Sequence, residues 1–121
     1  MKLFDDFYKM EQKTKTEIGF DCQLTFNPQH VIFKAHFPGH PITPGVCLVQ
    51  IAKELMEMHL DKKLVLRKVN NIKFLSVIKV SSVLSVVFAF SKIIQTDFGS
   101  TFSVLVAHDN VQFAKLNLEV I

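Results

Sequence analysis

The sequence contains few cysteines, no tryptophan and no concentration of charge. Two cysteines, Cys22 and Cys47, are too few for a disulfide scaffold and fit no zinc spacing, so we expect a reducing compartment. The formal net charge is only +3, and the basic residues are spread out rather than gathered into the dense face that nucleic acid binding requires. Nucleic acid is therefore not expected as a partner, whereas an acidic protein would suit the mild positive charge.

Hydrophobic runs suited to a membrane helix are also missing. Residues 35–52 contain no acidic residue, lysine or arginine, but three prolines and two glycines would break a membrane helix there. Asp5 and Asp6 interrupt any apolar stretch at the N-terminus, which argues against a signal peptide. We therefore expect a soluble, cytoplasmic protein with no membrane insertion. Hydrophobic residues make up 49% of the chain, enough to build a core.

The first third of the chain predicts short elements followed by a loop. Residues 3–12 predict a short N-terminal helix, because an aspartate near its start would complement the helix dipole, and residues 13–17 predict a polar loop. Residues 18–27 and 31–37 each predict a strand. The segment 37–45 holds three of the four prolines and two of the four glycines, which predicts an ordered loop.

A helix is predicted directly after this loop. We expect Thr43 to cap it, Pro44 to lie in its first turn and His59 to stand near its end. Residues 46–52 are apolar nearly all round, which predicts that the first two turns are buried. The later turns carry charged residues such as Glu54 and should emerge into solvent.

The rest of the chain predicts strands joined by short turns. These are expected at 64–74, 83–90, 101–107 and 111–121, with a bulge or bend near 67–70. The last strand shows the cleanest alternation of apolar and polar residues. The order of elements predicts an α+β fold with one domain, residues 1–121, in which a curled antiparallel sheet wraps around one central buried helix.

The loop and the start of the helix carry the candidate chemistry. Residues 36–50 read HFPGHPITPGVCLVQ. His36 enters a rigid loop, and its imidazole titrates near neutrality, so it can accept a proton. The backbone N–H groups of Gly45 and Val46 open the buried helix and lack partners within it. A thioester carbonyl placed there would be polarised, and the enolate formed on loss of a C2 proton would be stabilised.

This segment resembles the signature of the β-hydroxyacyl-acyl carrier protein dehydratases of the FabA/FabZ type. Their pattern is His-Phe-x-Gly-x-Pro-x-x-Pro-Gly, then mostly apolar residues, then Glu or Asp. The resemblance implies a hotdog fold and dehydration of 3-hydroxyacyl-acyl carrier protein to a trans-2-enoyl thioester. We expect no cofactor and no metal. It also implies sites at the interface of a homodimer or of a heterodimer with a related hotdog subunit. The catalytic positions would be His36 and Gln50, and the substrate-binding positions Phe37, Gly39, Pro44, Gly45 and Val46.

The residue at position 50 departs from the family pattern. Gln50 stands where the family has an acid, and an amide cannot supply a proton at neutral pH. Losing a general acid typically lowers the rate by roughly 10²–10⁴. A water, Glu54 or an acid-bearing partner could supply the proton instead. The alternatives are a non-catalytic or half-site subunit of a heteromeric dehydratase and a hotdog acyl thioesterase.

Other candidate residues have structural interpretations. His36 and His40 have the spacing of a helical metal pair, but Pro38, Gly39 and Pro41 forbid that helix. Cys47 is interpreted as a small apolar filler rather than a reactive thiol, and Glu54 as a solvated surface residue. The densest basic cluster is either a solvated strand start or a docking surface for acidic acyl carrier protein, and it comprises Lys62, Lys63, Arg67 and Lys68.

Overall fold

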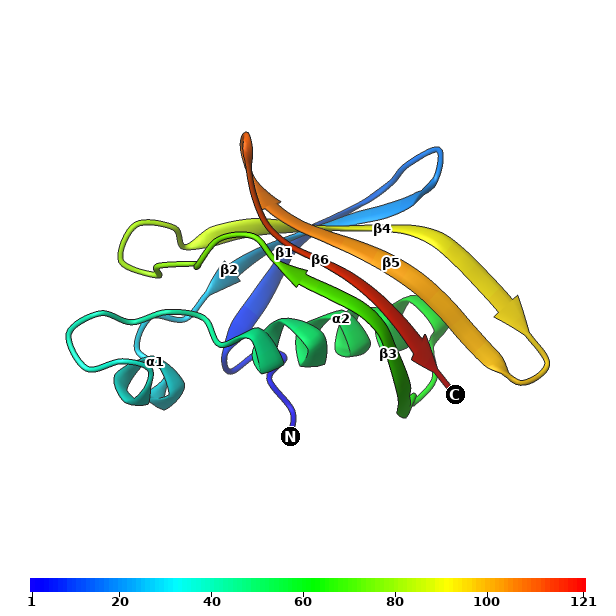
Figure 1. The fold of residues 1–121 in the computed structure, drawn as a ribbon, viewed down its shortest axis with the longest axis horizontal. Helices are drawn as coiled ribbons and strands as arrows, with labels where there is room; N and C mark the ends of the chain where they lie inside the picture. The colour runs from blue at the N-terminus through cyan, green and yellow to red at the C-terminus, as the bar shows by residue number, and fades with distance from the viewer.

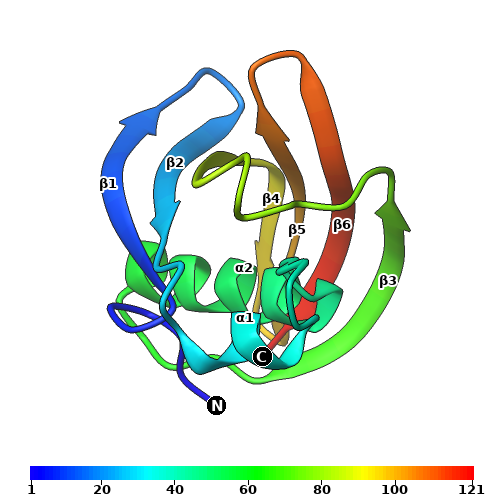
Figure 2. The same cartoon turned by 90° about the vertical axis from the view of Figure 1, so that its left-hand side faces the viewer.

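A computed structural model describes residues 1–121 as one antiparallel sheet that curves over a long helix (Figures 1 and 2). The strand order is β1-β2-β4-β5-β6-β3, so β1 and β3 form the two edges. The predicted α+β arrangement of a curled sheet around one main helix is confirmed. The elements are β1 (Tyr8–Lys15), β2 (Gly19–Phe26), α1 (Val31–Ala35), α2 (Gly45–Leu60), β3 (Leu66–Phe74), β4 (Ser85–Thr96), β5 (Gly99–His108) and β6 (Val111–Val120).

The central strands follow the alternation of their side chains. Every second residue points to the concave face and packs against α2, while the residues between them are more exposed. The predicted strands in this region are confirmed, and β4 continues past a bulge to Thr96. The buried residues of these strands include Val86, Phe88, Phe90, Phe102, Val104, Val106, Ala114, Leu116, Leu118 and Val120.

The N-terminal helix predicted at 3–12 is wrong. Residues 8–15 form β1, which pairs with β2 from Tyr8 opposite Phe26 to Lys15 opposite Phe20. The loop predicted at 13–17 therefore begins later, after Lys15. Only Tyr8 is buried in β1, because this edge strand is held by backbone hydrogen bonds and contributes little to the core.

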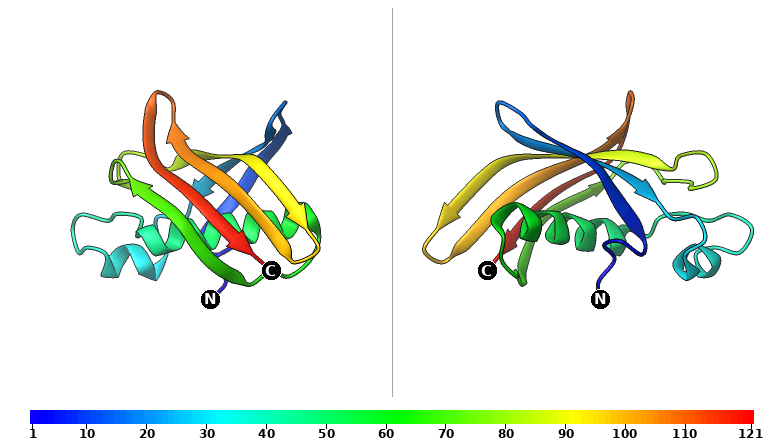
Figure 3. Two further views of the ribbon diagram at one scale, coloured as in Figure 1. Left: turned by 45° about the vertical axis from the view of Figure 1, so that its right-hand side comes forward. Right: turned by 180° about the vertical axis from the view of Figure 1, so that it is seen from behind.

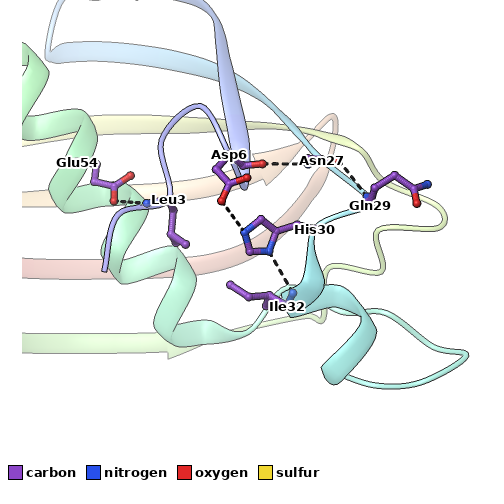
Figure 4. Close-up of polar contacts among 7 residues, drawn as sticks. All are labelled: Leu3, Asp6, Asn27, Gln29, His30, Ile32 and Glu54. Atoms are coloured by element: carbon purple, nitrogen blue, oxygen red, sulfur yellow. Dashed lines mark hydrogen bonds and ion pairs between the residues drawn. The ribbon is translucent and has the colours of Figure 1, made fainter.

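The strand predicted at 31–37 is also wrong, because residues 31–35 form the short helix α1 (Figure 4). Nδ1 of His30 accepts a hydrogen bond from the Ile32 N–H and so caps the helix, while Nε2 lies 3.2 Å from Asp6 Oδ2. The buried Phe33 ring stacks on Phe7 at 4.8 Å between centroids. His30 therefore has a structural role at the start of α1.

Helix α2 begins as predicted, but its cap and its exposure differ from expectation. Pro44 is the N-cap and makes no side-chain capping bond, whereas the Thr43 N–H donates to the Ile78 carbonyl at 2.9 Å. Val46 in the first turn is 67% exposed, and Glu54 two turns later is only 5% exposed. The expected passage from a buried start to a solvated end is therefore wrong at both residues. The sheet covers one face of α2, and the N-terminal residues cover Glu54.

Edge strand β3 carries the irregularity that the sequence predicted. Its pairing with β6 shifts register between Leu66 and Lys68 and again between Val69 and Asn71. Beyond Phe74, the chain turns into a loop that leads to β4. Figure 3 shows this loop and the loop before α2 projecting at the same end of the molecule.

Candidate active site

The loop between α1 and α2 is held by its own backbone hydrogen bonds. The His36 N–H, just after α1, donates to the Ile32 carbonyl at 3.0 Å, and the His36 carbonyl accepts from the Ile42 N–H at 2.8 Å. Phe37 and His40 exchange backbone bonds of 3.2 and 2.9 Å, which closes a tight turn. Gly39 stands in that turn at φ +82°, a conformation that glycine adopts without strain. The loop is therefore ordered, as predicted.

Residues 78–80, in the connection between β3 and β4, hold the end of this loop in place. The Thr43 N–H donates to Ile78 at 2.9 Å, and the Val80 N–H donates to Pro41 at 3.2 Å. Ile42 forms an isolated β-bridge with Lys79. Residues 41–43 therefore run beside residues 78–80 and bring the chain to the first turn of α2.

The first turn of α2 leaves backbone donors without acceptors. The N–H groups of Gly45 and Val46 make no backbone hydrogen bond, and no side chain caps this end. The Phe74 ring, from the end of β3, lies against Gly45 so closely that a Cβ at position 45 would lie 2.5 Å from Cζ. We call this region the helix mouth, defined by Gly45, Val46 and Phe74.

The His36 side chain is exposed and free of structural ties. It makes no hydrogen bond within the chain, and its ring contacts Phe37 at 5.6 Å between centroids. A histidine that served only to hold the loop would be bonded to it. Both ring nitrogens of His36 are therefore available to a ligand or to a second subunit.

Gln50 belongs to a polar network on the outer side of α2. Its Nε2 donates to Oε2 of Glu54 at 2.7 Å and to the Met1 carbonyl at 2.6 Å. The same Glu54 accepts from the Leu3 N–H at 2.7 Å, seen in Figure 4, and from the Tyr8 hydroxyl at 3.0 Å. Burial and the neighbouring Glu54 carboxylate raise the pKa of Tyr8. The expectation that Glu54 is a solvated surface residue is wrong.

His36 and Gln50 are not brought to one cavity within the chain. Gln50 and Glu54 line a cavity of about 590 Å³ along α2, and His36 is not among its lining residues. The segments that frame the helix mouth instead expose large apolar side chains to solvent, which are Phe37, Val46, Phe74, Leu75 and Val77. Exposed apolar groups of this kind are typical of an interaction surface.

The remaining candidates have simple surroundings. Cys47 is buried in the core, and burial raises the pKa of its thiol to about 11, in line with its interpretation as an apolar filler. No three His, Cys, Asp or Glu side chains gather as a possible metal site. None of the helices has the length and apolar character needed to cross a membrane.

Comparison with known proteins identifies the family. Residues 10–115, most of the chain, match the ApeI-like family, whose description is ApeI dehydratase. The chain belongs to the ApeI-like dehydratase family. The FabZ 3-hydroxyacyl-[acyl-carrier-protein] dehydratase of Clostridium acetobutylicum is 36% identical over 67 residues. That match covers 50% of this chain and 45% of FabZ, so the chain spans about half the length of this curated relative.

Two solved structures share the fold of this ApeI-like chain. One is the dehydratase heterocomplex ApeI:P from Xenorhabdus doucetiae, with a TM-score of 0.66, 16% identity and coverage of 93% of this chain and 96% of that one. The other is an uncharacterized protein from Erwinia carotovora subsp. atroseptica, with a TM-score of 0.57, 18% identity and coverage of 93% and 92%. The likeness supports the hotdog fold that the sequence resemblance implied.

Proposed function

We propose that this ApeI-like chain binds 3-hydroxyacyl thioesters carried by acyl carrier protein and takes part in their dehydration to trans-2-enoyl thioesters. The pathway would be fatty acid biosynthesis or a related lipid or polyene pathway. The observation that carries the proposal is the helix mouth. There the backbone N–H groups of Gly45 and Val46 have no acceptors, and the ordered loop before them bears His36, whose imidazole makes no hydrogen bond within the chain. Family membership supports the same reaction class.

The proposed mechanism begins with proton removal. His36 abstracts the C2 proton, and the N–H groups of Gly45 and Val46 receive the charge that develops on the thioester oxygen. The positive end of the α2 dipole adds to this stabilisation. Collapse of the enolate then breaks the bond between C3 and the hydroxyl oxygen, and that oxygen needs a proton to leave as water. Gln50 holds no proton acidic enough for this last step.

We propose that a second hotdog subunit completes the site. β3 is an edge strand with unpaired backbone groups, and the helix mouth is framed by exposed apolar side chains. Both features favour pairing with another subunit along this side. An acid-bearing relative would supply the missing proton to the His36 site, so the complex would be a heterodimer. The solved ApeI:P dehydratase heterocomplex supports this arrangement for an ApeI-like chain.

The test is to measure hydration of a trans-2-enoyl thioester by the chain alone and mixed with an acid-bearing hotdog relative. We expect turnover only in the mixture, and we expect the chain's His36→Ala variant to abolish it, because the imidazole is the proposed base. His40→Ala is the matched control, since His40 lies in the same loop and has no proposed chemical role. Turnover that survives His36→Ala would reject His36 as the base.

A half-site subunit without its own chemistry is the second candidate. Both N–H groups of the Gln50 amide are engaged within the chain, which favours a binding role for position 50. In that case the complex would form and keep its activity after His36→Ala. The thioesterase alternative has no such support. That reaction needs a carboxylate as nucleophile or base, and the Glu54 carboxylate of α2 already accepts hydrogen bonds from three donors within the chain.

A further inference from the structure

The Gln50 side chain has one polar atom without a partner. Its nitrogen Nε2 carries two N–H groups, and their acceptors are the Met1 carbonyl at 2.6 Å and Glu54 Oε2 at 2.7 Å. The carbonyl oxygen Oε1 takes part in no hydrogen bond within the chain. Gln50 also lines the cavity of about 590 Å³ beside α2. What it can offer to another molecule is therefore an acceptor.

The two acceptors beside Nε2 fix the orientation of the Gln50 amide. Rotating the group by 180° would put Oε1 beside two acceptors, the Met1 carbonyl and the Glu54 carboxylate, at the distances now spanned by hydrogen bonds. Glu54 cannot relieve this repulsion by turning away. It is 5% exposed and is held by the Leu3 N–H and by the hydroxyl of Tyr8, a residue with no exposed surface.

We propose that Glu54 is a positioning residue that makes Gln50 a hydrogen-bond acceptor, so that position 50 holds the 3-hydroxyl of a bound acyl thioester instead of protonating it. The ligand class is a thioester with a hydroxyl donor at C3, and this assignment rests on the proposed function. An acid at the same position would give its proton to the departing oxygen. Here the amide oxygen accepts a hydrogen bond from the hydroxyl, which keeps its proton and stays bonded to C3.

A preference for hydroxylated ligands follows. A net hydrogen bond of about 0.5–1.5 kcal/mol corresponds to a preference of roughly 2- to 12-fold for a 3-hydroxyacyl thioester over its 3-deoxy analogue. Glu54→Met keeps the length of the side chain but removes the acceptor beside Gln50 Nε2. Glu54→Gln keeps that acceptor, because its oxygen can still accept from the Leu3 N–H and from Gln50 while its nitrogen faces the Tyr8 hydroxyl. In Glu54→Met the Gln50 amide is held only by the carbonyl of Met1, a residue that is 72% exposed, so the amide can turn over and present N–H groups to the ligand. The preference should therefore fall to about 1 in Glu54→Met and persist in Glu54→Gln.

Two measurements on the full chain test this inference. The first follows the side-chain amide signals of Gln50 by NMR in the absence of ligand. In the wild type and in Glu54→Gln we expect these protons to exchange slowly with water, and Glu54→Met should shift them and speed their exchange. Glu57→Met is the matched control, because Glu57 lines the same cavity but makes no contact with Gln50. Unchanged Gln50 signals in a folded Glu54→Met variant, or fast exchange in the wild type or Glu54→Gln, would overturn the inference without involving any ligand.

The second measurement compares the dissociation constants of a 3-hydroxyacyl pantetheine thioester and its 3-deoxy analogue of equal length. The wild type, Glu54→Gln and Glu57→Met should prefer the hydroxylated ligand, and Glu54→Met should bind both alike. Equal binding of the two ligands by the wild type would overturn the role assigned to Glu54 and Gln50 while leaving thioester binding intact. Failure of both ligands to bind, with the amide signals as expected, would instead overturn the proposed function and with it the assignment of the ligand.

Discussion

The contact between Gly45 and Phe74 gives a quantitative test of the helix mouth. A Cβ added at position 45 would lie 2.5, 2.8 and 3.1 Å from Cζ, Cε1 and Cε2 of the Phe74 ring. Real Cβ atoms do not approach a ring so closely, so Gly45→Ala must displace it. Phe74 is 57% exposed, which lets the ring move outwards rather than compress the core.

Two opposing terms set the size of the effect. Alanine is more favourable than glycine in a helix by about 0.5–1 kcal/mol. Displacing the ring costs about 1–3 kcal/mol, the usual range for overpacking, and the lower end applies because the ring is half exposed. Gly45→Ala should therefore lower the free energy of unfolding by about 0–2 kcal/mol in the wild type. In a Phe74→Ala background the clash is gone, and Gly45→Ala should raise the free energy of unfolding by about 0.5–1 kcal/mol.

The assay is urea unfolding of the wild type, both single variants and the double variant, followed by far-UV circular dichroism. The four values form a double-mutant cycle whose coupling energy we expect to be about 1–3 kcal/mol. Gly39→Ala is the matched control, because nothing lies within 4 Å of its added Cβ and its cost comes only from φ +82°. Additive effects of Gly45→Ala and Phe74→Ala, within about 0.5 kcal/mol, would refute the contact.

Three further predictions concern stability and thiol chemistry. Glu54→Ala should lower the free energy of unfolding by about 2–5 kcal/mol, since it leaves the buried Leu3 N–H and Tyr8 hydroxyl without an acceptor, and urea unfolding against Glu57→Ala checks this. His36→Ala should change stability by less than about 0.5 kcal/mol in the same assay, because the exposed imidazole makes no hydrogen bond. Burial raises the pKa of Cys22 and Cys47 from 9.0 to about 11, so Ellman's reagent should label them at pH 8 only after unfolding. Because the unfolded thiols ionise first, stability should fall as pH rises from 9 to 11.

The central strands and α2 could be predicted because their burial is written in the local sequence. In β6, Lys115 and Glu119 alternate with residues that pack in the core, and a period of two has only one simple structural meaning. Helix α2 follows prolines and glycines that cannot continue a strand, and its length separates it from a buried strand. In these elements each residue reports the environment of its own side chain.

The N-terminal elements could not be predicted because their local signals point the wrong way. Phe4, Phe7 and Tyr8 are spaced as on one face of a helix, yet only Tyr8 lies in β1. Apart from Met10, the rest of that edge strand is polar. In α1, the apolar residues at positions 31–33 favour a strand, and a five-residue helix forms because His30 caps it. Both elements depend on partners distant in the sequence.

The candidate site also combines residues that have a local sequence signal with one that has none. The motif alone marks His36 and Gly45, because a rigid loop that enters a helix is encoded by prolines and glycines close together. The burial of Glu54 has no local signal, since its partners Leu3 and Tyr8 lie 51 and 46 residues away in sequence. A charged residue in a late helical turn normally faces solvent, and only the folded N-terminus changes that.

The pairing of Gln50 with Glu54 determines what would happen if the family's acid were restored. Gln50→Glu puts a second carboxyl group within hydrogen-bonding distance of Glu54, and two carboxylates this close cannot both be ionised near neutrality. The shared proton can also point to the Met1 carbonyl, which now accepts from Gln50. The variant should therefore carry a protonated acid at neutral pH and gain dehydratase activity.

In Gln50→Glu combined with Glu54→Gln, the proton is no longer shared, so activity should be lost at a lower pH than in the single variant. The assay is the dehydration rate of each of the two variants as a function of pH. Superimposable pH profiles would show that Glu54 does not act on position 50.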